Sequence, residues 1–208
     1  TVNGDFAINR GTFQIGNNNY GRTITVVGDL TVESAGSITT GTTNVSRDGS
    51  THTFTNGTHN GHKLELQGNF TNNGNVSFTN QAAENYGTAY SNVTNVFFTN
   101  TTGDQNVTIN GPTKFYSIRV QKGSDQTHTL NIDAAAEGQF QLMGPRTGWN
   151  YGNSTHTSSQ YFLALAIEGG TVRLGSHIKI GALMNDGNYG YKLDEGTCLW
   201  IDGADVTV

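Results

Sequence analysis

The segments TVNGDFAI (residues 1–8) and TVVGDLTV (residues 25–32) share the pattern apolar-x-Gly-Asp-apolar-x-apolar. LELQGNFT (residues 64–71) leads into the same pattern with Asn in place of Asp. A second unit, Gly-Thr-apolar-x-apolar-Gly, occurs as GTFQIG (11–16) and GTVRLG (170–175). Short strands and tight Gly turns that recur about every 20 to 25 residues are typical of a β-solenoid, in which each coil stacks on the previous one. The sequence therefore predicts an all-β solenoid.

Alternation along these strands predicts which side chains enter the core. Every second residue of a strand points to the same side, so the apolar position of each unit should face the lumen. A β-sandwich also has many short strands, but hairpins join them and no motif need recur at coil spacing. The inward residues predicted for the solenoid are Val2, Phe6, Ile8, Phe13, Ile15, Val32, Val107, Ile109, Ile118, Val120, Leu130, Ile132, Phe140, Leu142, Leu165, Ile167, Val172, Leu174, Ile178 and Ile180.

Composition and charge exclude several classes of function. Only 34% of the 208 residues are hydrophobic and 13% are charged, so neutral polar residues that favour strands and turns fill the chain. A net charge of −5 without a basic stripe argues against a nucleic-acid partner. No run of eighteen apolar residues is present, which argues against membrane insertion. Both ends read as strand interiors, so we expect residues 1–208 to be a single module cut from a larger secreted protein.

The tripeptide Asn-Tyr-Gly occurs four times and includes half of the eight tyrosines. All four copies, at 19–21, 85–87, 150–152 and 188–190, lie in irregular stretches between the strand units. Solenoids accept insertions at one corner of the coil, so we expect these loops to gather on one face and to carry the function. The two steps that join the first three copies are each close to three coils of about 22 residues, whereas the shorter step to the fourth fits no whole number of coils.

The aromatic loops predict a carbohydrate-binding site. Exposed Tyr and Trp rings stack on the apolar face of a pyranose, while Asn and Arg side chains bind its hydroxyl groups. The alternative is that the rings close the inserted loops over the solenoid. The residues predicted to bind carbohydrate are Trp149, Tyr151, Tyr189, Tyr191, Tyr86, Tyr20, Asn150 and Arg146.

The repeats TVVGDL (25–30) and GNFTNNG (68–74) resemble those of right-handed parallel β-helix domains in secreted Bacteroidetes proteins. Within that group the chain is similar to carbohydrate-binding modules attached to plant-polysaccharide hydrolases, particularly xylanases. The resemblance implies a secreted or cell-surface protein, a plant cell-wall ligand such as xylan, and a catalytic domain in the same parent chain. Long surface adhesins carry the same repeats, so a structural or adhesin role is the alternative.

Two residues near the C-terminus are predicted to lie in the core. Aligning residues 196–200 with the Gly-Thr unit at 11–15 places Cys198 and Trp200 in lumen positions. The same register turns Leu199 and Ile201 outward, which leaves the register open.

The acidic residues argue against an enzyme. A β-helix lyase or hydrolase needs paired acid and base groups, and Asp5 and Asp29 occupy turn positions with a structural role. We therefore expect no catalytic residues, with a lyase or hydrolase as the least favoured alternative. Calcium binding through Asp186, Asp202 or Asp205 stays open, although no ordered ligand loop is present. His59 and His62 supply only two of the three or four ligands that a zinc site needs, so no metal site is assigned.

Overall fold

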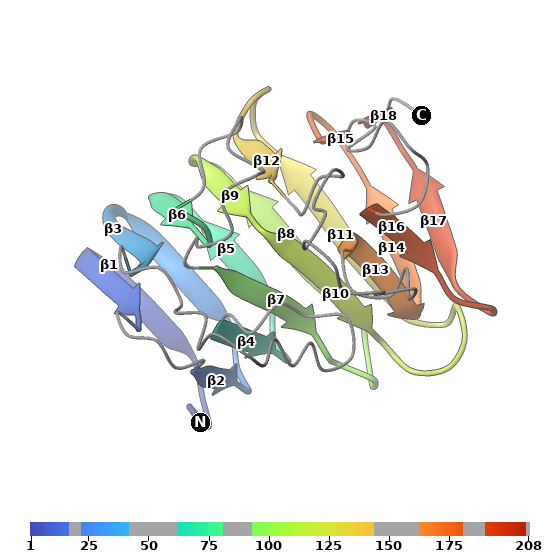
Figure 1. The fold of residues 1–208 in the computed structure, drawn as a ribbon, viewed down its shortest axis with the longest axis horizontal. Helices are drawn as coiled ribbons and strands as arrows, with labels where there is room; N and C mark the ends of the chain where they lie inside the picture. The colour runs from blue at the N-terminus through green and yellow to red at the C-terminus, as the bar shows by residue number, and fades with distance from the viewer. Residues whose placement is uncertain (17–21, 42–61, 81–92, 144–162, 181–189, 207–208) are drawn as a thin grey trace, which may run out of the picture.

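The computed structural model describes residues 1–16, 22–41, 62–80, 93–143, 163–180 and 190–206 (Figure 1). Every regular element in these ranges is a β-strand, which confirms the all-β prediction. The strands are β1 (Phe6–Ile15), β2 (Thr23–Val26), β3 (Leu30–Thr40), β4 (His62–Leu66), β5 (Phe70–Asn72), β6 (Asn75–Ser77), β7 (Thr94–Phe98), β8 (Gln105–Ile109), β9 (Thr113–Phe115), β10 (Ser117–Gln121), β11 (Thr129–Ala134), β12 (Phe140–Leu142), β13 (Leu163–Gly169), β14 (Thr171–Leu174), β15 (Lys179–Ile180), β16 (Gly190–Leu193), β17 (Cys198–Ile201) and β18 (Asp205–Val206).

The strands form parallel sheets that the chain visits in turn. The six-stranded sheet has the order β16-β13-β10-β7-β4-β2, and the ten-stranded sheet has the order β12-β9-β6-β3-β5-β8-β11-β14-β17 with β1 on β3. A third sheet pairs β15 with β18. Strands that follow one another in the chain do not pair as antiparallel hairpins, because every ladder between these strands is parallel. The described strands therefore do not form the hairpin-connected sandwich.

The ten-stranded sheet divides into two rows at β3. The first half of this long strand pairs with β5, and its second half pairs with β6. One row continues through β8, β11, β14 and β17, which we call the middle row, and the other continues through β9 and β12. A repeat consists of one strand of the six-stranded sheet together with the strands that follow it before the chain returns to that sheet. In the first repeat, which contains β1, an isolated parallel bridge from Val2 to Val26 of β2 takes the place of that strand.

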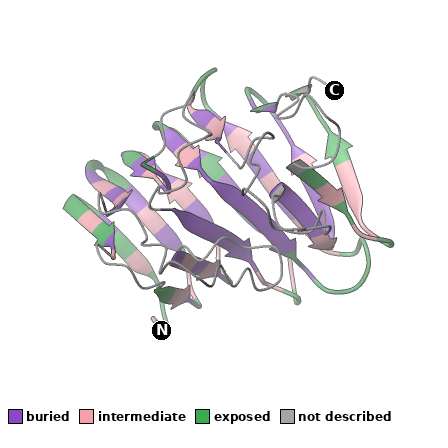
Figure 2. Cartoon of the chain, in the orientation of Figure 1, coloured by how far each residue is buried: buried purple, intermediate pink, exposed green. Residues whose placement is uncertain are grey.

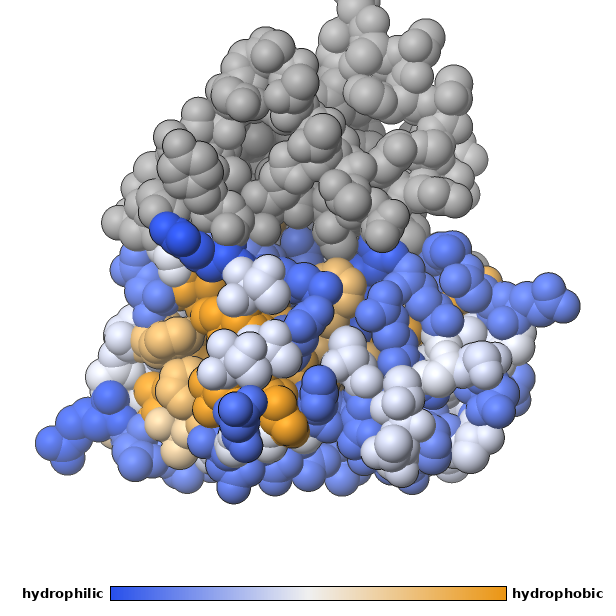
Figure 3. All heavy atoms as spheres, turned by 90° about the horizontal axis from the view of Figure 1, so that it is seen from below, coloured by the Kyte–Doolittle hydropathy of each residue, from blue (hydrophilic) through white to orange (hydrophobic). Residues whose placement is uncertain are grey.

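The core lies between these strands and contains the predicted inward side chains. Ile15, Val32 and Leu174 are each at most 1% exposed, and the pairs predicted from Val107 to Ile180 are buried except for Leu142, which is partly buried. Burial is lower at both ends of the stack (Figure 2). At the first end, Val2, Phe6 and Phe13 are only partly buried while packing against the core. In the view from below, hydrophobic surface also gathers at this first end of the stack (Figure 3).

Hydrogen bonds from turn side chains connect successive repeats. Oδ1 of Asp5 accepts the backbone N–H of Asp29 at 2.9 Å, and Oδ1 of Asp29 accepts the N–H of Asn69 at 2.7 Å. Oδ1 of Asn69 in turn accepts the N–H of Asn106 at 2.9 Å. The structural role predicted for Asp5 and Asp29 is thus confirmed, and the Gly-Asp and Gly-Asn motifs hold the repeats in register.

In each repeat one connection leads into the strand of the six-stranded sheet, and this connection accounts for most of the variation in repeat length. Residues 17–21, 42–61, 81–92, 144–162 and 181–189 follow β1, β3, β6, β12 and β15 and precede β2, β4, β7, β13 and β16. The same connection between β9 and β10 is the single residue Tyr116. Turn residues that bond to each other in neighbouring repeats are consequently 24 positions apart for Asp5 and Asp29 but 40 apart for Asp29 and Asn69.

The predicted spacing of three coils between Asn-Tyr-Gly copies is wrong. The first three copies precede β2, β7 and β13, and the fourth runs into β16 at Gly190. In the six-stranded sheet, these four strands are separated only by β4, between β2 and β7, and by β10, between β7 and β13. The two longer steps, between the first three copies, therefore each span two repeats, and the shorter step to the fourth copy spans one. The fourth copy fits the series once the repeats are counted by strands instead of by residues.

Candidate functional site

The predicted carbohydrate-binding residues fall mainly outside the described ranges. Only Tyr191 lies within them. The residues outside are Trp149, Tyr151, Tyr189, Tyr86, Tyr20, Asn150 and Arg146.

Tyr191 lies on strand β16 in the register of the core. It pairs with Leu165 of β13, and Leu193 pairs with Ile167, so both side chains continue rows of buried residues. Tyr191 is 37% exposed because β16 is the last strand of its sheet. Burial raises the pKa of its phenol to about 12. Tyr191 is thus a strand residue at the end of the core, in contrast to the loop position expected from the sequence.

The predicted core position of Trp200 is wrong. In the pairing of β14 with β17, Leu199 lies opposite Val172 and Ile201 opposite Leu174, so these two residues continue the core rows. Trp200 lies opposite Arg173 on the other face and is 50% exposed. Cys198 pairs with Thr171 and is partly buried.

A longer turn explains this reversal of faces. Thr171 follows Ile167 by four positions, whereas its partner Cys198 follows Leu193, the partner of Ile167, by five. The extra residue lies in a turn where the N–H of Thr197 donates to the carbonyl of Asp194 at 3.2 Å. A shift of one residue moves every side chain of a strand to the opposite face.

Arg173 organises a polar cluster beside Trp200 on the outward face of the middle row. Its Nε donates to Oδ2 of Asp202 at 2.7 Å, and its Nη1 donates to Oδ2 of Asp133 at 2.9 Å. The hydrogen bonds to Asp202 and Asp133 raise the pKa of the guanidinium. Its Cζ lies 5.7 Å from the centroid of the Trp200 ring. The cluster therefore places an exposed indole next to a guanidinium that two carboxylates hold in position.

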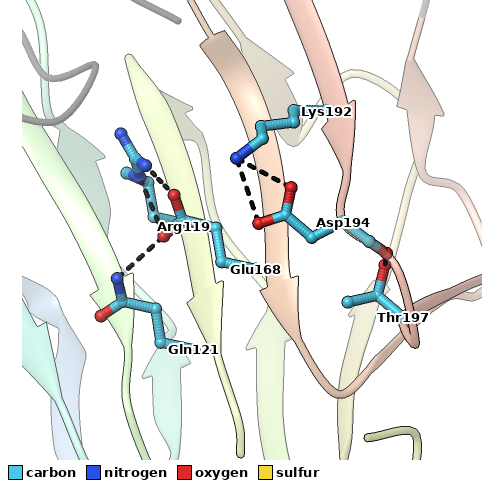
Figure 4. A network of polar contacts seen from close by, with 6 residues as sticks. All are labelled: Arg119, Gln121, Glu168, Lys192, Asp194 and Thr197. Carbon is cyan, nitrogen blue, oxygen red and sulfur yellow. Dashed lines mark hydrogen bonds and ion pairs between the residues drawn. The ribbon is translucent and has the colours of Figure 1, made fainter. Parts of the chain in front are cut away.

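The outward face of the six-stranded sheet carries a second polar network (Figure 4). Arg119 of β10 forms an ion pair with Glu168 of β13, and Nε2 of Gln121 donates to Oε2 of Glu168 at 2.8 Å. Lys192 of β16 forms an ion pair with Asp194 at 2.7 Å. The Arg119 side chain is only 6% exposed, and burial lowers the pKa of its guanidinium. This network has the properties of a structural contact between strands.

The residues considered as metal ligands are engaged in other contacts or lie outside the described ranges. Asp202 binds Arg173, and Asp205 forms an ion pair with Lys179. Nδ1 of His62 accepts the backbone N–H of Arg22 at 3.0 Å. Asp186 and His59 lie outside the described ranges. In the part of the chain that the structure describes, no three His, Cys, Asp or Glu side chains gather in a way that could hold a metal ion.

Comparisons with protein-family models, curated proteins and solved structures find no significant match. Among the described residues, no helix is long and apolar enough to cross a bilayer.

Proposed function

We propose that the chain is a non-catalytic carbohydrate-binding module with a right-handed parallel β-helix fold. Its ligand in this proposal is a plant cell-wall polysaccharide, with xylan as the first candidate. The resemblance of the repeats adds secretion and a catalytic domain in the same parent chain. Parallel sheets, visited in turn by repeats that share turn motifs, support the β-helix part of the proposal.

The position of the Asn-Tyr-Gly copies carries the functional part. Three lie in the connection that takes up most of the variation in repeat length, directly before the six-stranded sheet, and the fourth ends at Gly190, the first residue of β16. In a stack of repeats, equivalent connections lie along one edge, so the four tyrosines would form a line of aromatic rings. A line of rings suits an extended polysaccharide, because each ring can stack on a separate sugar.

Six of the thirteen described carboxylates lie in ion pairs, which favours a structural role for these six. Glu65, Glu168 and Asp194 are each paired with a Lys or Arg, as are Asp133, Asp202 and Asp205. A hydrolase needs one carboxyl group as acid and another as base or nucleophile around the scissile bond. Incubation with xylan, pectin and β-glucan should therefore release neither reducing ends nor unsaturated products.

Affinity electrophoresis in gels that contain xylan, pectin or β-glucan tests the proposal. We expect retardation of the parent chain in at least one gel and reduced retardation of Tyr86→Ala. Tyr90→Ala is the matched control, because Tyr90 lies in the same connection but outside an Asn-Tyr-Gly tripeptide. Equal mobility of the parent chain in all gels would reject the proposal in favour of a structural or adhesin repeat, and product release would indicate an enzyme.

A further inference from the structure

The outward row that contains Trp200 changes its chemistry in the last two repeats. In register along the middle row, the residues are Asp5, Asp29, Asn69, Asn106, Asn131, Arg173 and Trp200. From Asp5 to Asn69 the side chains accept backbone N–H groups of the next repeat, and Nδ2 of Asn131 donates to Oδ1 of Asn106 at 3.2 Å. Arg173 and Trp200 make no such ladder contact. The fold therefore does not require an indole at this position.

The cluster around Trp200 is held in place before any ligand arrives. Arg173 of β14 connects the strands on either side of it, since Asp133 lies on β11 and Asp202 directly follows β17. Asp133 is fixed further, because its Oδ1 accepts the backbone N–H of Ser176 at 3.1 Å. A guanidinium near an indole restricts the motion of both side chains by a cation–π contact. Less conformational entropy is then lost when a ligand binds.

Hydrogen-bonding groups of both kinds lie on the same face of the sheet as the indole. Among the described residues, Nη2 of Arg173 has no acceptor, and Oδ1 of Asn131 and Oδ1 of Asp202 have no donor. Asn131, Arg173 and Trp200 lie on adjacent strands, which are about 4.8 Å apart in a parallel sheet. An aromatic surface flanked by donors and acceptors matches a sugar ring, whose apolar C–H face is bordered by hydroxyl groups.

The charge of the cluster selects among sugars. One guanidinium is opposed by two carboxylates, whose side chains are 44% and 46% exposed for Asp133 and Asp202. The carboxylates already occupy Nε and Nη1 of Arg173, so each of the two pairs of nitrogens that could make a two-point contact with an anion, Nε with Nη2 and Nη1 with Nη2, has one member engaged. A uronate or phosphate would therefore meet net negative charge. The fitting ligand is an uncharged pyranose.

We propose that Trp200, Arg173, Asn131 and Asp202 form a second carbohydrate-binding surface, separate in sequence from the Asn-Tyr-Gly connections, for an uncharged pyranose of the polysaccharide. This inference rests on the proposed function, since it adds a subsite to the same binding activity. It places a sugar ring against the exposed part of the Trp200 indole, with its hydroxyl groups bonded to the three polar side chains.

Two measurements on the whole chain test this surface with soluble neutral xylo-oligosaccharides and cello-oligosaccharides. Trp149 and Trp200 are the two tryptophans, so a ¹H–¹⁵N spectrum should show two indole cross-peaks, and Trp200→Tyr identifies one of them. We expect the Trp200 peak to shift on titration. Trp200→Ala should weaken binding about five- to thirtyfold, the effect of losing one stacked ring, whereas Trp200→Tyr should restore most of it. Val27→Ala, which removes another exposed apolar side chain, is the control.

The outcomes separate this surface from the proposed function. If the parent chain binds the oligosaccharides, but the Trp200 peak stays in place and Trp200→Ala binds like the parent, the second surface is rejected and the module function stands. If the parent chain binds no polysaccharide at all, both proposals fail. Trp200→Ala could lose binding and also melt at a lower temperature than Trp200→Tyr. In that case the Trp200 peak of the parent chain decides: a peak that does not shift on titration rejects the surface, and a peak that shifts supports it.

Discussion

The backbone N–H of Asn69 donates a 2.7 Å hydrogen bond to Oδ1 of Asp29, which lies 40 residues earlier in the chain. The same oxygen also accepts Nδ2 of Asn69 at 3.1 Å. This contact joins two repeats that the long connection at 42–61 separates in sequence. A short side chain with an acceptor oxygen at the turn therefore keeps the repeats in register, whatever length the intervening connection has.

Replacement of Asp29 by Ala should lower the free energy of unfolding by about 1 kcal/mol, because two donors of Asn69 lose their acceptor at an exposed turn. Asp29→Asn keeps an acceptor oxygen, as Asn69 itself does in the next repeat, and should stay close to the parent chain. Urea unfolding followed by circular dichroism measures both variants. Identical midpoints for Asp29→Ala and Asp29→Asn would contradict the role of the side-chain acceptor.

Gly74 should tolerate no side chain, because the repeats approach each other closely at this turn. A Cβ at this position would overlap the carbonyl oxygens of Gly36 and Glu33 in the preceding repeat. Backbone atoms cannot move aside as a flexible side chain does, so we expect Gly74→Ala to cost about 3 kcal/mol of stability. Gly4→Ala is the matched control, since a Cβ there has no atom within 4 Å. Equal melting temperatures for the two variants would show that the turn can open.

The buried Lys122 should make stability depend on pH above neutrality. Its Nζ donates to the carbonyl oxygens of Asn100 at 3.0 Å and Gly103 at 2.7 Å, and to Oε1 of Gln105 at 3.1 Å. Burial lowers the pKa of Lys122 to about 8, with the charge of Asp104 opposing the shift. The unfolded chain should have the ordinary lysine pKa of about 10.4. Between these values the unfolded chain holds a proton that the folded chain has lost.

The free energy of unfolding should therefore rise with pH from about 8 to about 10.4, by at most about 1.4 kcal/mol per pH unit from this group. Below pH 8 both states are protonated, and the contribution no longer changes. Guanidinium unfolding of the parent chain and of Lys122→Met across this range isolates the effect, since Met keeps most of the length of the side chain without a titrating group. Parallel stability curves for the two proteins would contradict the lowered pKa.

The core and the turns could be predicted from the sequence because they depend on local pattern. Alternation next to a Gly-Thr unit correctly predicts that Ile15 and Leu174 are buried, and the place of Asp29 in a repeated turn correctly predicts its structural role. Trp200 could not be placed in this way, because a single additional residue before Cys198 reverses the face of β17. Turn length is set by hydrogen bonds that the alternation pattern does not contain.

The other differences between prediction and structure arise from contacts between repeats. Residue numbers predict the wrong spacing for the Asn-Tyr-Gly copies, because they do not count repeats when one connection varies in length. The buried Lys122 and Gln105 carry no sequence signal, because apart from their contact with each other they donate to backbone carbonyls, including those of Leu66 and Gly68 in the preceding repeat. The exposed aromatic and guanidinium pair on β17 and β14 likewise appears only when the register of the two strands is known.

Tyr191 and Tyr151 should respond differently to replacement by Ala, although both belong to the predicted binding residues. Tyr191 extends the core row that contains Leu165 and is more than half buried, so Tyr191→Ala should remove about 1 to 2 kcal/mol of stability by exposing apolar surface. Tyr191→Leu keeps an apolar side chain in the row and should recover most of this loss.

Under the proposed function, Tyr151→Ala should instead weaken polysaccharide binding about five- to thirtyfold at an unchanged melting temperature. Differential scanning calorimetry and affinity electrophoresis on the same three variants distinguish the two roles. A Tyr191→Ala chain that melts like the parent would remove Tyr191 from the core, and a Tyr151→Ala chain that loses binding only together with stability would assign that loop to packing.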